Sequence, residues 1–128
     1  MIVKKFYKCN ICGNIFGVVN DSGVIPVCCA EPMVVLKANS TDAAAEKHVP
    51  VIERSGDMVT VKVGSVPHPM TDEHYIQWII VTNKSGFTER IELKPAEEPL
   101  AAFTMKENEG PVTAYEYCTL HGLWVAEE

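Results

Sequence analysis

The sequence contains no long apolar run. None approaches the roughly 20 residues that a membrane-spanning helix needs, and residues 1–8 lack the apolar core of a secretory signal peptide. We therefore expect a protein that does not cross a membrane and that resides in the cytoplasm.

Positive charge is also scarce. The chain has 11 Lys and Arg against 17 Asp and Glu, which gives a formal net charge of −6. This balance argues against sequence-independent binding to nucleic acid or to an anionic membrane. The 47% hydrophobic and 22% charged residues are typical of a folded chain, and 128 residues suit one domain or two small ones.

No segment has a helical period of useful length, whereas alternating apolar and polar stretches recur from His48 onward. Their number and their spacing by turn residues predict an all-β sandwich. The expected strands are residues 51–53, 58–63, 74–82, 88–93, 100–105, 112–118 and 123–126.

The first part of the chain predicts a smaller unit of short strands over residues 2–7, 15–19 and 33–36, separated by glycines and prolines. A unit of about 40 residues or fewer usually needs a metal or disulfides for stability. We therefore expect a metal-stapled domain over residues 1–37 and a second domain over residues 38–128. Residues 37–47 are expected to form a linker or a short helical turn.

Five cysteines cannot all pair in intramolecular disulfides, and clustered cysteines in a reducing compartment more often bind metal or do redox chemistry. Cys9 and Cys12 form a Cys-x-x-Cys knuckle, and the adjacent Cys28 and Cys29 follow after 15 residues. Four thiolates suit tetrahedral zinc or iron, and the adjacent pair predicts a distorted tetrahedron. A purely structural zinc knuckle fits the same spacing.

The remaining cysteine, Cys118, stands two residues before His121, so both side chains can reach one metal across a tight turn. His48, His68 and His74 also fall at ends or connections of predicted strands, which can gather at one edge of a sandwich. Imidazole suits iron, copper, nickel and zinc, while five ligands exceed the usual tetrahedral set of zinc and suggest a square pyramid with an open sixth position.

These residues resemble the desulfoferrodoxin family, the two-iron superoxide reductases, essentially from end to end. The resemblance is carried by the knuckle Cys9–Cys12 with Cys28 and Cys29, by residues 45–53, by Pro67–Met70 with His74, and by residues 118–124. It implies a desulforedoxin-like domain with Fe(Cys)4, bound by Cys9, Cys12, Cys28 and Cys29. It also implies an immunoglobulin-like domain with Fe(His)4(Cys), bound equatorially by His48, His68, His74 and His121 and axially by Cys118.

The implied function is one-electron reduction of superoxide to hydrogen peroxide at the non-haem Fe(II) site, which detoxifies superoxide. Reduced rubredoxin is the implied electron donor, and a homodimer is the implied assembly. By the family pattern, Lys47 supplies positive charge for superoxide capture and Glu46 occupies the sixth iron position in the ferric state. Without the resemblance, this pair has the pattern of a solvated surface pair.

Two other functions fit parts of the same sequence. One is a rubredoxin-like electron carrier that uses only the four-cysteine iron. The other is a non-catalytic binding module that joins a structural zinc knuckle to a β-sandwich. Metal content separates these functions. A superoxide reductase requires two irons per chain, an electron carrier requires one iron, and a structural zinc module requires one zinc.

Overall fold

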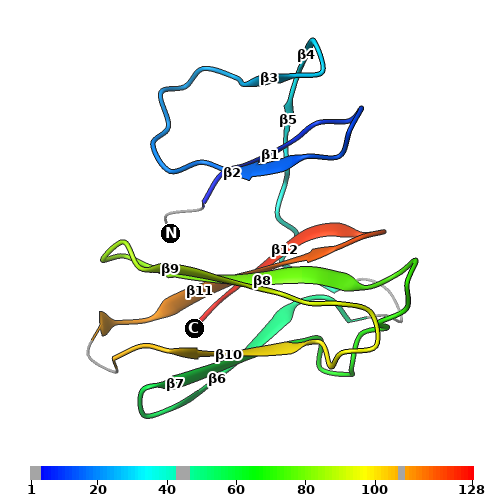
Figure 1. Ribbon diagram of the computed structural model, residues 1–128. Helices are drawn as coiled ribbons and strands as arrows, with labels where there is room; N and C mark the ends of the chain where they lie inside the picture. The colour runs from blue at the N-terminus through cyan, green and yellow to red at the C-terminus, as the bar shows by residue number, and fades with distance from the viewer. Residues whose placement is uncertain (1–3, 43–46, 107–108) are drawn as a thin grey trace. The chain divides into compact units, whose positions relative to one another are not determined.

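The computed structural model describes residues 4–42, 47–106 and 109–128, which form strands and loops (Figure 1). The chain divides into two compact units, Met1–Lys37 and Ala38–Glu128. The described residues contain no α-helix, so the predicted all-β class is confirmed. No helix among them is long and apolar enough to cross a membrane.

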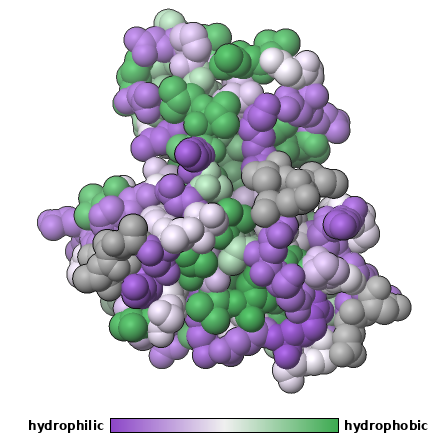
Figure 2. Space-filling model, turned by 180° about the vertical axis from the view of Figure 1, so that it is seen from behind, coloured by the Kyte–Doolittle hydropathy of each residue, from purple (hydrophilic) through white to green (hydrophobic). Residues whose placement is uncertain are grey.

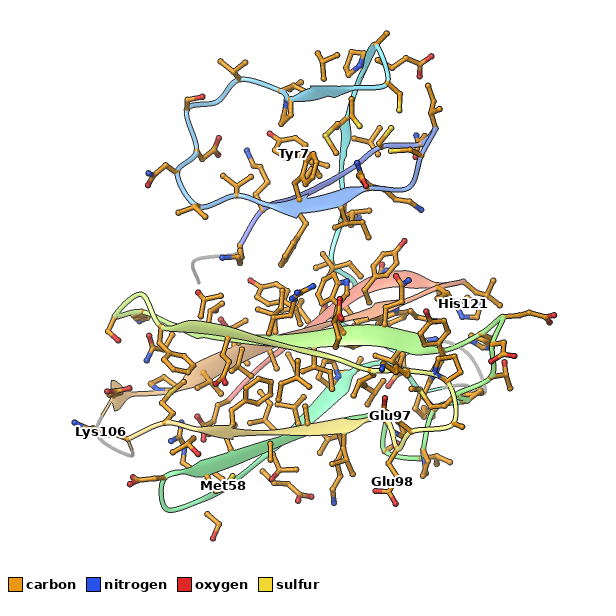
Figure 3. All side chains as sticks on the ribbon, viewed as in Figure 1. Tyr7, Met58, Glu97, Glu98, Lys106 and His121 are labelled. Atoms are coloured by element: carbon orange, nitrogen blue, oxygen red, sulfur yellow. The ribbon has the colours of Figure 1, made fainter. Side chains whose placement is uncertain are left out.

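The first unit is built from very short antiparallel strands. Its three-stranded sheet has the order β2 (Ile15–Gly17), β1 (Phe6–Lys8), β5 (Val34–Val35), and a separate hairpin joins β3 (Val27–Cys28) to β4 (Glu31–Pro32). Tyr7, Cys9 and Met33 form its small buried cluster, and Tyr7 is labelled in Figure 3. A cluster this small buries little apolar surface, which agrees with the need for a staple.

The strands predicted for this unit are present but shorter than expected. Residues 15–19 shorten to β2, and residues 33–36 shorten to β5. Of residues 2–7, only the part from Phe6 is in β1, and residues 2 and 3 lie outside the described residues. The hairpin β3–β4 was not predicted, because its four strand residues are too few to produce an alternating pattern.

Apolar side chains reach the surface of the first unit among polar ones, as Figure 2 shows. Val19, Val24 and Val27 are 90%, 74% and 66% exposed. With short strands and a small core, the unit has no interior large enough to enclose them.

The described residues of the second unit form seven strands in two antiparallel sheets (Figure 1). One sheet has the order β10 (Leu100–Thr104), β7 (Met58–Val63), β6 (Pro50–Ser55). The other has the order β12 (Gly122–Glu127), β11 (Val112–Cys118), β8 (Ile76–Asn83), β9 (Thr88–Glu92). Each strand lies where the sequence predicts it, with its ends shifted by at most two residues.

The core of the sandwich lies between the two sheets. Val59, Val61 and Val63 of β7 alternate with more exposed residues and are 0%, 0% and 1% exposed. They belong to one cluster with Ile79 of β8 and Ala114 of β11. Burying each valine contributes about 2 kcal/mol, so this face of β7 anchors the sheets to each other.

An ion pair ties the end of β12 to the other sheet. Arg54 of β6 donates from Nε and Nη2 to the two carboxylate oxygens of Glu128, at 2.7 and 2.8 Å. The backbone N–H of Val112 donates to the same carboxylate at 3.1 Å. These bonds, with Arg54 as the largest cause, lower the pKa of Glu128.

The segment before β6 pairs with β12 at the edge of the sandwich. Asn39 forms a parallel bridge with Trp124, its N–H donates to Leu123 O, and its carbonyl accepts from Val125 N, both at 2.9 Å. The described residues 38–42 form no helical turn, and the expected linker or helical turn over residues 37–47 stays a prediction. Residues 43–46 lie outside the described residues.

Candidate metal centres

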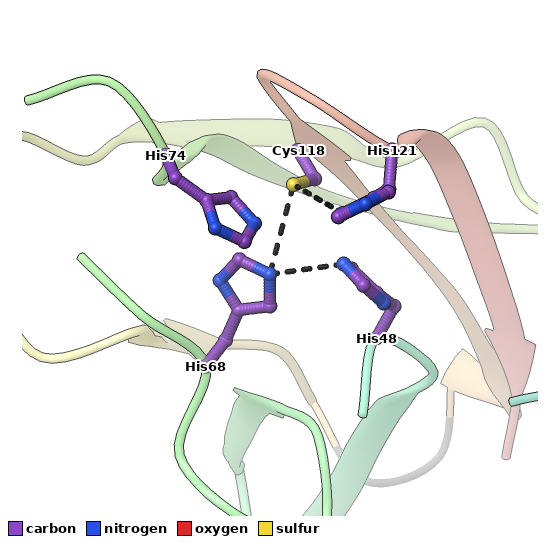
Figure 4. A group of neighbouring side chains, drawn as sticks. All are labelled: His48, His68, His74, Cys118 and His121. Atoms are coloured by element: carbon purple, nitrogen blue, oxygen red, sulfur yellow. Dashed lines mark hydrogen bonds between the residues drawn. The ribbon is translucent and has the colours of Figure 1, made fainter. Parts of the chain in front are cut away.

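Four imidazoles and one thiol converge at one end of the sandwich, where their side chains point toward one another (Figure 4). One nitrogen or sulfur atom from each residue lies within 4.8 Å of every other. The group contains His48, His68, His74, Cys118 and His121.

The topology explains why residues far apart in the sequence meet here. His48 stands just before β6, and His68 and His74 lie in the connection from β7 to β8. Cys118 is the last residue of β11, and His121 lies in the turn before β12. Antiparallel strands bring all these ends and connections to the same end of the sandwich, as the sequence predicted.

His68 is oriented by a hydrogen bond on the side of its ring away from the group. Its Nδ1 lies 2.7 Å from Pro69 O, so this nitrogen is the donor and Nε2 keeps its lone pair. That Nε2 lies 2.9 Å from Nε2 of His48 and 3.6 Å from Sγ of Cys118. A metal-ligating histidine normally has this arrangement.

Cys118 is fully buried, and its Sγ also lies 3.8 Å from Nδ1 of His121. The pairing of β11 with β8 shifts register between Tyr117 and Cys118, so that Cys118 pairs with Ile76. Such an irregularity re-aims side chains, and here it accompanies the inward position of the thiol. His121 is exposed, whereas His48 and His68 are only 3% and 4% exposed, so solvent reaches the group on the His121 side.

Trp124 is buried and contacts two members of the group. Its ring stacks on His48 at 4.7 Å between centroids and 12° between planes, and its Nε1–H donates to His121 O at 3.1 Å. From the sequence, a buried tryptophan is expected to have a hydrogen-bond partner for its Nε1–H, but the sequence does not identify that partner.

Thr119 links the Cys118–His121 turn to the segment that carries His74. Its N–H donates to Tyr75 O at 3.0 Å, and its hydroxyl donates to Glu73 O and accepts from Tyr75 N, both at 3.2 Å. Sequence reasoning missed this residue, because a lone threonine in a turn has no distinguishing pattern.

Of the two predicted catalytic residues, Glu46 lies outside the described residues. Lys47 is half-buried and directly precedes His48, so its backbone is adjacent to the five-residue group.

Glu116 is a buried acidic residue that the sequence did not single out. It lies on β11 two residues before Cys118 and is 0% exposed. Neither carboxylate oxygen has a hydrogen-bond partner among the described residues. Burial, and secondarily the charge of Asp42, raise the pKa of Glu116 well above its usual range.

The four remaining cysteines gather in the first unit, with their sulfur atoms within 4.8 Å of one another. The Cys-x-x-Cys knuckle forms as predicted. Backbone N–H groups of Ile11 and Cys12 donate to Sγ of Cys9 at 3.4 and 3.5 Å, and Gly13 adopts φ +82°. Sγ of Cys12 lies 3.6 Å from Sγ of Cys28.

The adjacent pair of cysteines is accommodated by a tight turn. Cys28 pairs with Glu31, so Cys29 and Ala30 form the two-residue loop of the β3–β4 hairpin. Both have positive φ, 53° and 62°, as a type I′ turn requires. Neither is the glycine or asparagine that such a turn favours, so backbone strain is concentrated beside the sulfur cluster.

The thiol pKa values indicate that this cluster suits a cation. Amide hydrogen bonds, first from Cys12 and then from Ile11, lower the pKa of Cys9 to about 6. The neighbouring thiols, Cys12 first, raise the pKa of Cys28 and raise that of Cys29 to about 12. Crowded thiolates repel one another, and a bound metal ion removes this repulsion.

The fold and the two donor sets define a class of protein: an all-β chain with one all-thiolate metal centre and one imidazole–thiolate metal centre. Both sets fit iron, because their donors converge, His68 holds the tautomer that a ligand needs, and the sulfur cluster favours a cation.

Comparison with known proteins gives the family. The desulfoferrodoxin model matches residues 40–127, and the model of the desulfoferrodoxin N-terminal domain matches residues 3–36. The chain belongs to the desulfoferrodoxin family, and its two donor sets match the Fe(Cys)4 and Fe(His)4(Cys) centres of two-iron members.

Individual relatives cover nearly the whole chain. It is 50% identical over 122 residues to a desulfoferrodoxin homolog of Archaeoglobus fulgidus, which spans 95% of both chains. A desulfoferrodoxin of Nitratidesulfovibrio vulgaris is 46% identical, covering 96% of this chain and 95% of the relative. The superoxide reductase of Treponema pallidum has a similar structure, with a TM-score of 0.83, 33% identity and coverage of 97% and 98%.

Proposed function

We propose that this protein is a superoxide reductase, which reduces superoxide to hydrogen peroxide at the five-residue site of the sandwich. The observation that carries the proposal is the convergence of four imidazoles and one buried thiol in a desulfoferrodoxin chain. Relatives named superoxide reductase support it, among them one from Pyrococcus horikoshii, 41% identical over 106 residues.

The reaction consumes one electron and two protons for each superoxide and forms one hydrogen peroxide. His48, His68, His74, His121 and Cys118 would hold the iron, which would supply the electron and bind an anionic oxygen ligand. The protein must hold the imidazoles in place, keep the thiol ionised and admit solvent protons. The hydrogen bond at His68 helps to hold the imidazoles in place, and the exposed side at His121 admits solvent protons.

We assign the two parts of the chain to separate roles. Residues 1–37 form the desulforedoxin-like domain, with iron bound by Cys9, Cys12, Cys28 and Cys29. Residues 38–128 form the superoxide reductase domain.

Capture of an anion by a chain of net charge −6 requires a positive local field. A divalent ion with one thiolate leaves a single positive charge, and Lys47 adds another beside His48. In this proposal Lys47 would attract superoxide and help to place a proton-delivering water, while Glu46 would serve as a further ligand of the oxidised metal.

Replacing Cys118 by serine tests this function. We expect Cys118→Ser to abolish reduction of a superoxide pulse, measured by pulse radiolysis together with peroxide yield, because the thiolate ligand is lost. The visible spectrum of the four-cysteine centre serves as the internal control and should persist. Retained reduction would remove Cys118 from the site, and oxygen release during turnover would indicate dismutation instead.

Metal analysis separates this function from the simpler ones. Two irons per purified chain are expected here, because each donor set takes one. One zinc would favour a structural module, and one iron bound only by cysteines would favour an electron carrier.

We further propose reduced rubredoxin as the electron donor, a homodimer as the assembly and the cytoplasm as the location. Free thiolates and ferrous iron require a reducing compartment, which supports the last. Stopped-flow reoxidation of reduced rubredoxin, ultracentrifugation and cell fractionation test the three in turn. No reoxidation, a monomer or a membrane-bound fraction would contradict the corresponding proposal.

A further inference from the structure

We propose that Asp42 and Gly64 are positioning residues that hold the peptide group between Lys47 and His48, and thereby set the place of Lys47 beside the metal site. We call Asp42 and Gly64 the peptide cradle. The inference rests on the proposed function, in which Lys47 attracts superoxide.

Gly64 forms one side of the cradle, against the carbonyl of this peptide group. Its φ is +81°, and a Cβ at this position would lie 2.3 Å from Lys47 O and 3.0 Å from Lys47 C. It would also lie 2.7 Å from Val66 O. All three atoms belong to the backbone, so no side chain can rotate to make room. Only glycine allows the carbonyl of Lys47 to lie here.

Asp42 forms the other side, at the N–H of the same peptide group. Its Oδ1 accepts hydrogen bonds from His48 N at 2.6 Å and from Val49 N at 3.1 Å. Hydrogen bonds to a charged acceptor are stronger than those between neutral groups. Gly64 N in turn donates to Val49 O at 3.3 Å, so the cradle contacts the backbone on both sides.

The carbonyl of Lys47 and the N–H of His48 belong to one planar unit. Packing against its oxygen and bonding its N–H therefore restrict this plane and the positions of the two Cα atoms that it joins, from which the side chains of Lys47 and His48 leave the backbone. His48 is held further, by its ring stacked on Trp124 and by any metal it binds. A disturbance of the cradle should therefore displace Lys47 more than the metal ligand.

The first test is Gly64→Ala in the full iron-loaded chain. We expect superoxide capture to slow by about tenfold, because small misplacements of a positioning group have effects of this size or larger. Its dependence on ionic strength should weaken, while iron content and visible spectrum stay as in the wild type. The matched control is Gly86→Ala, since Gly86 also has positive φ, +98°, but a Cβ there meets nothing within 4 Å.

A double-mutant cycle shows whether Gly64 acts through Lys47. In a Lys47→Ala background, Gly64→Ala should slow capture no further. An equal slowing in both backgrounds would overturn the positioning role, as would unchanged capture in Gly64→Ala alone. If Lys47→Ala by itself left capture unchanged, the role of Lys47 in the proposed function would fail.

Hydrogen exchange, which does not depend on enzyme turnover, tests the peptide cradle even if Lys47 has no role in capture. In zinc-loaded protein, we expect slow hydrogen exchange at the amides of His48 and Val49. Asp42→Ala should speed it, and Asp42→Asn, which keeps an acceptor oxygen, should largely restore protection. Unchanged exchange at both amides in Asp42→Ala would overturn the cradle, whatever the role of Lys47.

Discussion

At the scale of single residues, backbone conformation near the sulfur cluster matters as much as the sulfur atoms. Cys29 and Ala30 both adopt positive φ to turn the chain between β3 and β4. Positive φ costs a residue with a Cβ about 1–2 kcal/mol, and the chain tolerates this at both positions. The turn thus allows two adjacent cysteines to serve one cluster.

Ala30→Gly should relieve part of this strain. We expect the first unit to gain about 1 kcal/mol, because glycine adopts φ +62° without the steric cost. This gain should be measured as slower loss of iron from the four-cysteine centre to a chelator. Ala102→Gly is the control, since Ala102 lies in β10 and glycine should weaken that strand. Faster iron loss in Ala30→Gly would contradict the strain argument.

Trp124 is a second residue whose role depends on its contacts. Trp124→Leu should lower iron affinity of the five-residue site by about tenfold, because both the stacking on His48 and the bond to His121 O are lost. Trp124→Phe keeps an aromatic ring, so its iron affinity should lie between those of the wild type and Trp124→Leu. Chelator competition measures this. Wild-type affinity in Trp124→Leu would show that the two contacts are dispensable.

At the scale of elements, the sandwich is closed at the end of β12 by one carboxylate. Arg54 holds the pKa of Glu128 below its usual value. A lowered folded-state pKa means that the bond stabilises the protein above the unfolded pKa of Glu128, near 4.3. This stabilisation disappears as the pH falls through the folded pKa.

Glu128→Gln should therefore lower the free energy of unfolding by about 1 kcal/mol at pH 7. The difference from wild type should begin to shrink as the pH falls below the unfolded pKa, near 4.3, and should vanish below the lowered folded-state pKa, where the wild-type carboxylate is protonated. Denaturant unfolding across this range measures it. The neighbouring Glu127→Gln serves as the control and should have a smaller effect. A difference independent of pH would exclude the ion pair as its cause.

At the scale of the whole molecule, the two units have different sources of stability. The sandwich buries a continuous core between two sheets, whereas the first unit has a cluster of three buried residues and strands of two or three residues. Binding energy of a structural metal is folding energy in such small units. The first unit should therefore depend on its metal, and the sandwich should not.

Cys9→Ser tests this division in the full chain. We expect loss of the four-cysteine spectrum and rapid proteolysis within residues 1–37, because the staple is removed. Thermal unfolding of the sandwich and the iron of the five-residue site should be unchanged. Cys118→Ser is the reciprocal control and should leave the first unit resistant to protease. Unfolding of the sandwich in Cys9→Ser would show that its stability depends on the first unit.

The sequence by itself determined the all-β class, the positions of the seven sandwich strands and the residues of both donor sets. These features follow local rules. Alternation marks strands whose one face is buried, and cysteine and histidine are identifiable as ligands wherever they stand. The convergence of His48 with Cys118 could be predicted because strand ends meet at one end of a sandwich.

Only the tertiary structure decided which ordinary residues support those ligands. Gly64 lies against Lys47 O, Trp124 stacks on His48, and the carboxyl of Glu116 is enclosed without a partner among the described residues. Each of these facts depends on contacts between segments far apart in the chain, and no local pattern records them. Sequence periodicity specifies which face a residue occupies, whereas packing across the sandwich specifies what that residue contacts.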